Sequence, residues 1–591
     1  MAAAALLGAA CVGNIGNERG TAGGGGGGGS SGGGASGSSG GSSSSSSGSN
    51  PPPPPMQQGP GAVLSYPNGP APVARLRRLT TPEFTYSVQD LLGGTSVPIS
   101  AVDPDVSVGV WGPSAVNLGG FATIGASSVS TSPSGVGLYE AAVRGATTAA
   151  FGNMSQLSSI LSCVPTSTTD PCLTTAINAF GRRAFRRPLT SAETMTLVNL
   201  ATTIGGQSGN TVLNGLQYAL NAILQWPDFL YRVELGAPSA ADNGRLKYSS
   251  YEIASRLAAT LWSSVPDDTL LDAAGMDALS TPAGITTQAQ RMIADPRAHR
   301  ALAAFTDELF ALQGMSTVSK DATLFPAWTA TLGSAMQQEL ELRVDDMVFN
   351  QKGNFFSLFT STSTFANSEL AKFYGLSAPS GTGFQPVTFP SGSPRVGILG
   401  SGAILATEAL ADRTSPVKRG LLVDQMLRCE VISAPPPGVP PLPPTLSSNM
   451  TVRQELDNHV ANPACSSCHS LLDPIGFGME NFDATGQYRT TEKGMPIDAS
   501  GTLNFTDASG KANSIAFHDL GGLEAALQQD PATAPCLVAN FYVRALGRAA
   551  IGFDEPSINT LTTQFAAAGN KVDQLLVSLV SSDSFRFVVP Q

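Results

Sequence analysis

The sequence lacks the long apolar runs that cross a membrane. No stretch of 18 or more consecutive apolar residues occurs among its 591 residues, and a membrane-spanning helix needs about 20. Charge is also scarce, because only 13% of the residues are Asp, Glu, Lys or Arg and the net charge is −11. Such a chain has no basic surface suited to a nucleic acid. We therefore expect neither a transmembrane helix nor nucleic-acid binding.

Histidine and cysteine are rare as well, with 4 and 7 copies in the whole chain. Three of these residues stand together in Cys465-Ser466-Ser467-Cys468-His469. A C-x-x-C-H sequence is typical of c-type haem attachment, in which both thiols bind the haem covalently and the histidine binds its iron. At this composition the pattern arises by chance about 6 × 10⁻⁴ times per chain. We predict one haem c on Cys465 and Cys468, with His469 as the proximal iron ligand.

Two other interpretations of the cysteine pair stay open. The two thiols could form a redox disulfide, or they could provide half of a zinc site. Zinc needs four ligands, and the rest of the chain contains no second C-x-x-C and no H-x-x-x-H. The haem interpretation is therefore favoured. The remaining cysteines and histidines are Cys11, Cys163, Cys172, Cys429, Cys536, His299, His459 and His518.

Several residues could occupy the second axial position of the iron. His459 stands six residues before the motif, on a helix expected over 452–460 that could fold back over the haem. Met479, ten residues after the motif histidine, is the competing ligand, and its thioether would raise the reduction potential. We favour His459 over Met479 and His518, with an open or water-ligated iron as the alternative. Pro474 is expected to orient the proximal histidine through its backbone carbonyl.

The first residues resemble the end of a bacterial lipoprotein signal peptide. An apolar, alanine-rich run leads to Cys11, which would carry the lipid. No Lys or Arg precedes the run and Gly8 replaces a larger aliphatic residue, so an incidental cysteine in an unstructured N-terminus is the alternative. Residues 21–60 are glycine, serine and proline with almost nothing apolar to bury. We predict a signal and lipidation site over 1–11 and a disordered Gly/Ser/Pro tether over 12–72.

The other cysteines favour an oxidising compartment. Apart from Cys11 and the motif pair, four remain, and four cysteines allow three pairings. Cys163 and Cys172 are close in sequence, which favours a bridge between them. Cys429 would then pair with Cys536 and fasten the last segment to the segment that precedes the motif. We therefore expect an exported protein of the cell envelope, either periplasmic or held at the outer membrane or cell surface.

Helical patterns recur along the chain after residue 73, except over 95–134, where short strands and loop both stay open. Apolar spacing and capping signals predict helices over 81–92, 173–187, 211–235 with a bend near Pro227, 249–262, 288–312, 329–349, 395–405, 413–427 and 452–460. The fold class that follows is mainly α and multidomain, with a small cytochrome c-like haem segment near the C-terminus. The expected domains are a small N-terminal domain (73–170), a helical domain (171–245), a central helical domain (246–390), a haem-binding domain with a Pro-rich connector (391–510) and a C-terminal helical domain (511–591).

Two charge patterns could have chemical roles. The run Gly181-Arg182-Arg183-Ala184-Phe185-Arg186-Arg187 could clamp a haem propionate, although a solvated helix end is the interpretation we favour. The pairs Asp345 with Asp346 and Glu339 with Glu341 could act as an acid and a base. Because no nucleophile or metal motif stands beside them, we expect exposed helix faces.

Six groups of residues follow one another in a specific order. They are 77–80 with 90–93, 183–190, 251–257 with 261–268, 413–420, 467–486 and 544–548. In this order they resemble the planctomycete and myxobacterial cytochrome-like proteins, which are strings of domains of unknown function. The resemblance covers about residues 75–591 and implies a haem-bearing exported protein without implying a particular reaction. It also implies a histidine at the position of His459 and an aliphatic residue other than methionine at that of Met479.

The predicted function is electron transfer at the cell envelope. The protein would carry one haem c, contact the membrane only through a lipid anchor and exchange electrons with a redox partner protein. Roughly 500 folded residues are more than one haem requires, so two alternatives stay open. One is a haem-dependent oxidoreductase of the peroxidase or oxidase kind with an open iron face, and the other is a surface binding protein with a structural haem.

Overall fold

The computed structural model describes Leu64 and residues 76–111, 119–432, 449–461, 463–507 and 509–588. The chain is mainly helical, with 55% helix and 8% strand, and multidomain, which confirms the predicted class. All described residues belong to one contact unit, 56–591. Cys11 and the expected tether lie outside the described residues, apart from Leu64.

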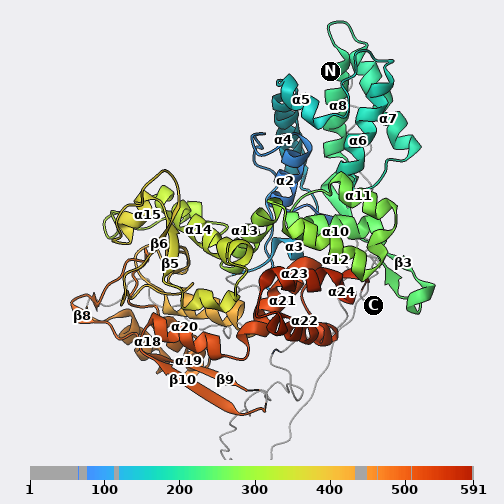
Figure 1. Cartoon of the computed structure of the whole chain (residues 1–591). Coiled ribbons are helices and arrows are strands. Elements are labelled where there is room, and N and C mark those ends of the chain that lie inside the picture. The colour runs from blue at the N-terminus through green and yellow to red at the C-terminus, as the bar shows by residue number, and fades with distance from the viewer. Residues whose placement is uncertain are drawn as a thin grey trace, which may run out of the picture. The chain divides into compact units, whose positions relative to one another are not determined.

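The first helices form a bundle around an apolar core of their own (Figure 1). Helix α8 packs against α4, α6 and α7, and Phe84 and Leu220 are fully buried between the helices. The chain enters and leaves the bundle through an antiparallel strand pair in which Leu76 faces Val233. The elements are β1 (Leu76–Arg78), α2 (Thr81–Leu91), α4 (Pro133–Phe151), α5 (Met154–Ile160), α6 (Pro171–Ala184), α7 (Ser191–Gly205), α8 (Val212–Gln225), α9 (Pro227–Leu230) and β2 (Tyr231–Val233).

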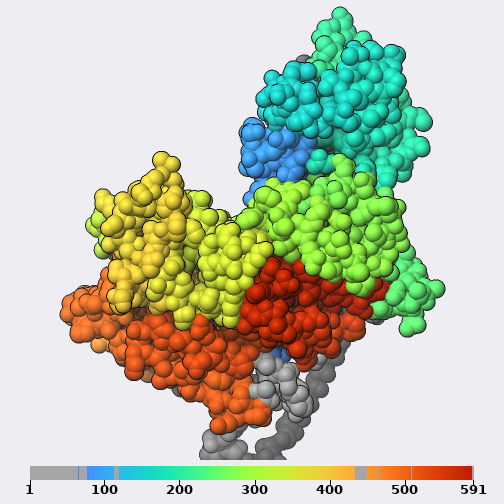
Figure 2. Space-filling model, viewed as in Figure 1, coloured from blue at the N-terminus to red at the C-terminus, as the bar shows by residue number. Residues whose placement is uncertain are grey.

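A larger core joins the central helices to the C-terminal ones. Helix α21 is buried along most of its length, and α23 packs along α12. Figure 2 shows the C-terminal segment in red lying against the central helices in green. The helices are α3 (Ala122–Gly125), α10 (Ser250–Trp262), α11 (Asp268–Gly275), α12 (Pro282–Ile293), α13 (Arg297–Leu309), α14 (Ala330–Asp345), α15 (Ser368–Phe373), α16 (Gly402–Thr407), α17 (Pro416–Leu422), α20 (Leu520–Gln529), α21 (Thr533–Leu546), α22 (Glu555–Ala567), α23 (Val572–Ser581) and α24 (Asp583–Arg586).

Strands are short and pair only in twos within the described ranges. Each pair is antiparallel, and the longest, β9 with β10, packs against the helix that carries the cysteine motif. Two π-helical turns, Asp346–Asn350 and Val423–Leu427, directly extend α14 and α17. The remaining strands are β3 (Ala237–Pro238), β4 (Leu246–Lys247), β5 (Ser363–Ala366), β6 (Gln385–Thr388), β7 (Thr491–Glu492), β8 (Met495–Pro496), β9 (Gly501–Thr506) and β10 (Ala512–Phe517).

Three expected helices differ from the structure, and one of them, 288–312, is divided between α12 and α13 with a break over 294–296. The single bent helix over 211–235 is wrong: α8 ends at Gln225 because Trp226, which precedes Pro227, takes an extended conformation. The helix expected over 395–405 is also wrong, since regular helix begins only at Gly402. Ahead of it the backbone is held by distant side chains, and the Leu399 amide donates to the buried Glu524 carboxylate at 2.6 Å.

The basic run in α6 is neither a solvated helix end nor an open anion clamp. Arg186 is buried and donates to the Asp228 and Phe229 carbonyl oxygens, both at 2.9 Å. Arg187 donates to both carboxylate oxygens of Glu193 at 2.9 and 3.0 Å. Arg186 and Arg187 therefore tie the end of α6 to α7 and α9.

The acidic pairs of α14 are not simply exposed helix faces either. Glu339 is fully buried and accepts hydrogen bonds from Thr364 (2.5 Å) and Tyr374 (2.6 Å). Glu341 lies beside Asp307, and burial together with the charge of Glu341 raises the pKa of Asp307 to about 8. The prediction of exposure is wrong because other elements pack against the polar side of α14 as well as against its apolar side.

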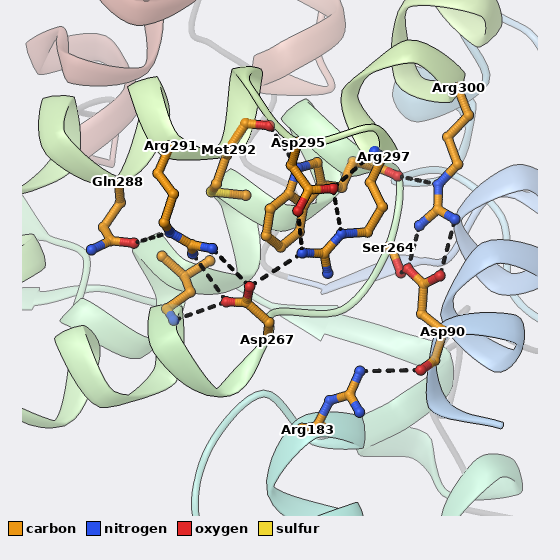
Figure 3. A network of polar contacts seen from close by, with 12 residues as sticks. Asp90, Arg183, Ser264, Asp267, Gln288, Arg291, Met292, Asp295, Arg297 and Arg300 are labelled. Carbon is orange, nitrogen blue, oxygen red and sulfur yellow. Dashed lines mark hydrogen bonds and ion pairs between the residues drawn. The ribbon is translucent and has the colours of Figure 1, made fainter. Parts of the chain in front are cut away.

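An arginine network surrounds Trp262 and joins the bundle to the central helices (Figure 3). Asp90 on α2 accepts from Arg300 of α13 at 3.0 Å and from the Ser264 hydroxyl at 2.6 Å. Arg183 of α6 donates to the Asp90 carbonyl oxygen at 3.1 Å. Several of the residues that carry the family resemblance are thus structural ties between segments.

The same network continues at the start of α11. Asp267 caps that helix and accepts from Arg291 at 2.8 and 3.0 Å and from Arg297 at 3.2 Å. The Arg297 guanidinium carbon lies 3.4 Å from the Trp262 ring centroid, which is close enough for a cation–π contact. Helices α11, α12 and α13 are therefore fixed to one another by charge as well as by apolar packing.

Both expected cysteine pairs are disulfides in the structure. Cys163 is bonded to Cys172 next to the start of α6, and Cys429 is bonded to Cys536 on α21. The second bridge closes 107 residues of sequence and fastens the C-terminal helices to the end of the turn that follows α17. Within the described ranges, no helix combines the length and the apolar character that a membrane crossing requires.

Candidate haem site

The cysteine motif lies in the first half of a helix that is preceded by a shorter one. Helix α18 (Val452–Val460) begins at a capping box between Thr451 and Gln454, as its sequence predicts. Helix α19 (Pro463–Phe477) follows almost at once and contains the whole motif. The two helices pack against each other, which brings the end of α18 to the motif.

Helix α19 is fixed by close backbone contact with α17. A Cβ atom on Gly420 would lie 2.1 Å from the Leu472 carbonyl oxygen, and one on Gly476 would lie 2.0 Å from the Pro416 carbonyl oxygen. Both distances are far shorter than van der Waals contact, so only glycine allows this approach. The C-terminal half of α19 therefore has a defined position from which the motif projects.

Arg419 on α17 secures the turn that follows α19. Its fully buried guanidinium donates to the carbonyl oxygens of Met479 (2.8 Å), Phe482 (2.9 Å) and Asp483 (2.8 Å). Glu480 lies 3.6 Å away and balances the charge. Burial lowers the pKa of the Arg419 guanidinium to about 10, so the side chain stays cationic at neutral pH.

The two motif cysteines carry free thiols. Cys465 is 4% exposed and Cys468 is partly buried, and no bond joins them. The other four cysteines of the described chain are all in disulfides. The structure therefore does not contain the disulfide between Cys465 and Cys468 that the alternative interpretation allows, and both sulfur atoms can form another bond.

His469 is oriented by an acid one helical turn later. Its Nδ1 atom lies 2.9 Å and 3.1 Å from the two carboxylate oxygens of the buried Asp473. A carboxylate only accepts, so Nδ1 carries the proton and donates, which leaves Nε2 as the free lone pair. Sequence reasoning misses Asp473, although its spacing of four residues from the histidine on a helix is the signal that would find it.

The role expected of Pro474 is wrong. The Pro474 carbonyl oxygen lies against β9 instead, where a Cβ on Gly501 would stand 2.0 Å from it. Because that oxygen faces the strand, the Asp473 side chain takes the position beside His469 Nδ1. The proline still lies within α19, near the C-terminal end of the helix.

Of the three candidate distal ligands, His459 is the one that the structure brings to the motif. Its ring centroid lies 4.9 Å from that of His469, with 70° between the ring planes. Partial burial and the neighbouring His469 lower the pKa of His459. Met479 is 0% exposed in the main core beside Phe482, and His518 is exposed between β10 and α20.

The residue types around the motif fit a haem, provided that the two histidines separate slightly. An imidazole nitrogen lies about 2 Å from a metal that it binds, so two axial histidines on one iron have ring centroids roughly 6 Å apart. The observed 4.9 Å is shorter by about an ångström. A haem held by both histidines would require the two rings to stand about an ångström further apart than they do here.

Apolar packing around the motif is thin. Two small clusters border it, each with three buried residues, whereas the main core is far larger. The clusters consist of Leu421, Ile432 and Leu472 and of Val452, Leu456 and Phe477. Leu471, on α19 itself, is half exposed. Among the residues that the structure describes, the motif therefore has little apolar packing, and the connector over 433–448 lies outside those residues.

The donor set fits a haem better than a zinc ion. No group of three or more His, Cys, Asp or Glu side chains converges on a metal position within the ranges that the structure describes. A structural zinc ion needs four such ligands. A haem iron needs only one or two, because the macrocycle supplies the other four.

Four family models match the chain, and each is described as a protein of unknown function. They form a series of planctomycete-type cytochrome-like domains. The matches are DUF1595 over 172–234, DUF1592 over 248–376, DUF1588 over 395–492 and DUF1585 over 515–585. The third of these ranges contains the whole cysteine motif. No curated protein and no solved structure matches the sequence.

Proposed function

We propose that Cys465 and Cys468 bind one c-type haem covalently, that His469 is its proximal ligand, and that the protein transfers single electrons. The observation that carries the proposal is the hydrogen bond from His469 Nδ1 to Asp473, 2.9 Å long, within a helix whose two thiols are free. A metal-binding histidine ordinarily donates its second ring N–H in this way. When bound, the haem supplies a one-electron couple.

Asp473 has a positioning role in this proposal. Its carboxylate fixes the tautomer and the ring plane of His469, and it makes Nε2 a stronger donor to a cation. A more basic axial ligand favours the oxidised iron and lowers the reduction potential. Because Asp473 is buried, the interaction is shielded from solvent.

His459 favours electron transfer over oxidase or peroxidase chemistry. Its ring stands 4.9 Å from that of His469, so it is placed to take the second axial position. With both axial positions filled by histidine, no small substrate reaches the iron directly. Electrons would then pass through the exposed edge of the site to a redox partner protein.

Export is part of the same proposal. Covalent haem attachment and stable disulfides both belong outside the reducing cytoplasm. The bonds Cys163–Cys172 and Cys429–Cys536 support such a location. Lipidation of Cys11 would then hold the protein at the cell envelope, with membrane contact through the lipid alone.

The experiment that tests the haem is production of the full chain with a c-type maturation system. A denaturing gel stained for haem, together with the reduced-minus-oxidised visible spectrum, should show a covalently bound haem. Cys465→Ala/Cys468→Ala should abolish both signals. Cys163→Ala/Cys172→Ala, which removes two other cysteines, should keep them. A wild-type protein without haem would overturn the proposal.

The distal ligand is tested separately. His459→Ala should convert a low-spin spectrum to a high-spin one and allow carbon monoxide to bind the reduced iron. His299→Ala removes a histidine elsewhere in the chain and should leave the spectrum unchanged. If His459→Ala also leaves it unchanged, His459 is not the ligand and the electron-carrier assignment loses its support.

A further inference from the structure

A polar cavity of about 340 Å³ lies between the central and C-terminal helices, in elements other than those that carry the cysteine motif. Its walls come from α12, the start of α13, the π-helical turn after α14, and α23. Two of the family matches, 248–376 and 515–585, thus contribute to it. Its polar lining residues are Gln290, His299, Asn350, Lys352, Asp573 and Gln574.

Asp573, one of the residues that line this cavity, has a largely buried carboxylate. The residue is 9% exposed, and its Oδ2 accepts from the Gln574 side chain at 3.1 Å. Its Oδ1 is buried and has no hydrogen-bond partner within the part of the chain that the structure describes. A buried carboxylate oxygen without a donor is costly, and a rotation that turned Oδ1 toward the cavity would let it accept from an O–H or N–H group of a ligand.

His299 presents a second directed group. Its Nδ1 lies 2.6 Å from Asp345 Oδ1, and its ring packs on Phe349 with 4.4 Å between centroids. The carboxylate requires the proton on Nδ1, so Nε2 is a lone-pair acceptor. Nε2 has no partner among the described residues. Asp345 therefore orients His299 as a fixed hydrogen-bonding group on the cavity wall.

The backbone beside these groups departs from regular helix. Residues Asp346–Asn350 form a π-helical turn, a feature that occurs often at functional sites. Lys352, two residues later, has a φ of +46°, which side chains other than glycine rarely adopt. The departure places Asn350 and Lys352 at the cavity instead of continuing α14.

The chemistry of the lining selects an uncharged ligand with many hydroxyl groups. Asp573 and the Nε2 of His299 need donors, whereas Lys352 and the side-chain amide N–H groups need acceptors. The charges of Asp573 and Lys352 oppose each other, and Asp345 is engaged by His299. A hydroxyl group, which both donates and accepts, can satisfy both sets.

We propose that this cavity binds a neutral, hydroxyl-rich small molecule about the size of a monosaccharide. A volume of 340 Å³ stands at the lower end of the range for small-molecule sites. Val348, Phe349 and Val577 also line it and give the carbon face of a sugar ring an apolar surface. The site uses no residue of the candidate haem site, so the two proposals are independent.

The test is saturation-transfer NMR and calorimetry on the full-length protein. The probes are D-glucose, D-galactose, D-mannose, N-acetyl-D-glucosamine and myo-inositol, with ethylammonium as a cationic comparison. At least one of the neutral probes should bind. Asp573→Asn, which preserves shape, and His299→Gln should each weaken that binding by about tenfold. Asp412→Asn, an exposed aspartate in another segment, should leave it unchanged.

Three results would overturn the proposal. They are the absence of binding by every neutral probe, equal binding by wild type and Asp573→Asn, and preferential binding of ethylammonium. Thermal unfolding of each variant shows whether the fold is kept, and His299→Gln gives a second measure if Asp573→Asn is unstable. Binding should be the same in the haem-free Cys465→Ala/Cys468→Ala protein, so loss of the haem proposal leaves this test intact.

Discussion

The arginine network around Trp262 and the segment around the cysteine motif are completed in different ways. In the network (Figure 3), Asp90 and Asp267 each accept hydrogen bonds from at least two side chains of other elements. Beside the motif, two thiols are free, the ring of His469 lies 4.9 Å from that of His459, and the apolar clusters are small. The first region is complete as protein, whereas the second has the residues for a further group.

The largest effect is expected at Arg419, beside the segment around the cysteine motif. Like the arginines of the network, Arg419 donates hydrogen bonds to other segments of the protein. Arg419→Met leaves four carbonyl oxygens, those of Leu405, Met479, Phe482 and Asp483, without their buried donor, and it removes one of the two cations beside Glu480. Removing one partner of a buried charge pair costs about 3–5 kcal/mol. Denaturant unfolding should show a fall of that size in the free energy of unfolding.

A neighbouring residue provides the control for this change. Lys418→Met alters a half-buried cation one position earlier on α17 and should cost less than about 1 kcal/mol. If the two variants lose similar amounts of unfolding free energy, Arg419 does not stabilise the fold more than its neighbour does. The candidate haem site would then rest on apolar packing with α17 alone.

A smaller and pH-dependent effect is expected in the network. Burial by itself would raise the pKa of Asp267, but hydrogen bonds from Arg291 and the charge of Arg297 outweigh it, and the pKa is lowered. Because the folded pKa is below the unfolded one, the stabilisation is present above about pH 4 and is lost as the pH falls through the folded pKa. Asp267→Asn should cost about 1–2 kcal/mol at pH 7, and the difference from wild type should vanish in acid.

Thermal and denaturant unfolding between pH 2 and pH 7 would measure this difference. Asp268→Asn, at the next and more exposed residue, should change stability by less than about 0.5 kcal/mol at any pH. A constant cost for Asp267→Asn across the pH range would contradict the role of its charge. Network stability would then come from packing on Trp262.

The third expected effect is a change in the reduction potential of the haem-loaded protein. Asp473→Asn keeps the shape of the side chain but removes the charge that makes His469 more basic. The midpoint potential of the haem-loaded protein should rise by roughly 60 mV, a tenfold change in the one-electron equilibrium. Asp272→Asn, at an exposed residue of α11, should leave the potential within a few millivolts. An unchanged potential in Asp473→Asn would remove its positioning role.

Local signals in the sequence predict local structure well. Helix α10 begins at a capping box of Ser249 with Glu252, and α18 begins at one of Thr451 with Gln454, so the expected starts of both are confirmed. His459 and the motif are close in sequence, which is why a sequence pattern could bring them together. Asp473 is missed because the role of orienting His469 is assigned, from the sequence, to the next residue, Pro474.

The sequence does not predict which residues far apart along the chain will contact one another. Glu339 is buried because the Thr364 hydroxyl and Tyr374, both from later elements, happen to meet α14. The region around Leu399 is not helical because Glu524, 125 residues later, accepts from its amide. Neither periodicity nor charge pattern carries such information, since each contact depends on the packing of whole segments.

The smallest effect is expected from Met479, and it separates the two candidate ligands most directly. Met479 is fully buried in the main core; its carbonyl oxygen accepts from Arg419 and from the Phe482 amide, and its own amide donates to the Gly476 carbonyl oxygen. Met479→Leu keeps the volume, so it should cost less than about 1.5 kcal/mol of unfolding free energy and leave the visible spectrum and the potential unchanged. Loss of a sulfur ligand would instead change the spin state or lower the potential of the haem. Such a change would exchange the roles of the two residues, because the main core would then have to open to bring Met479 to the iron while His459 stayed outside.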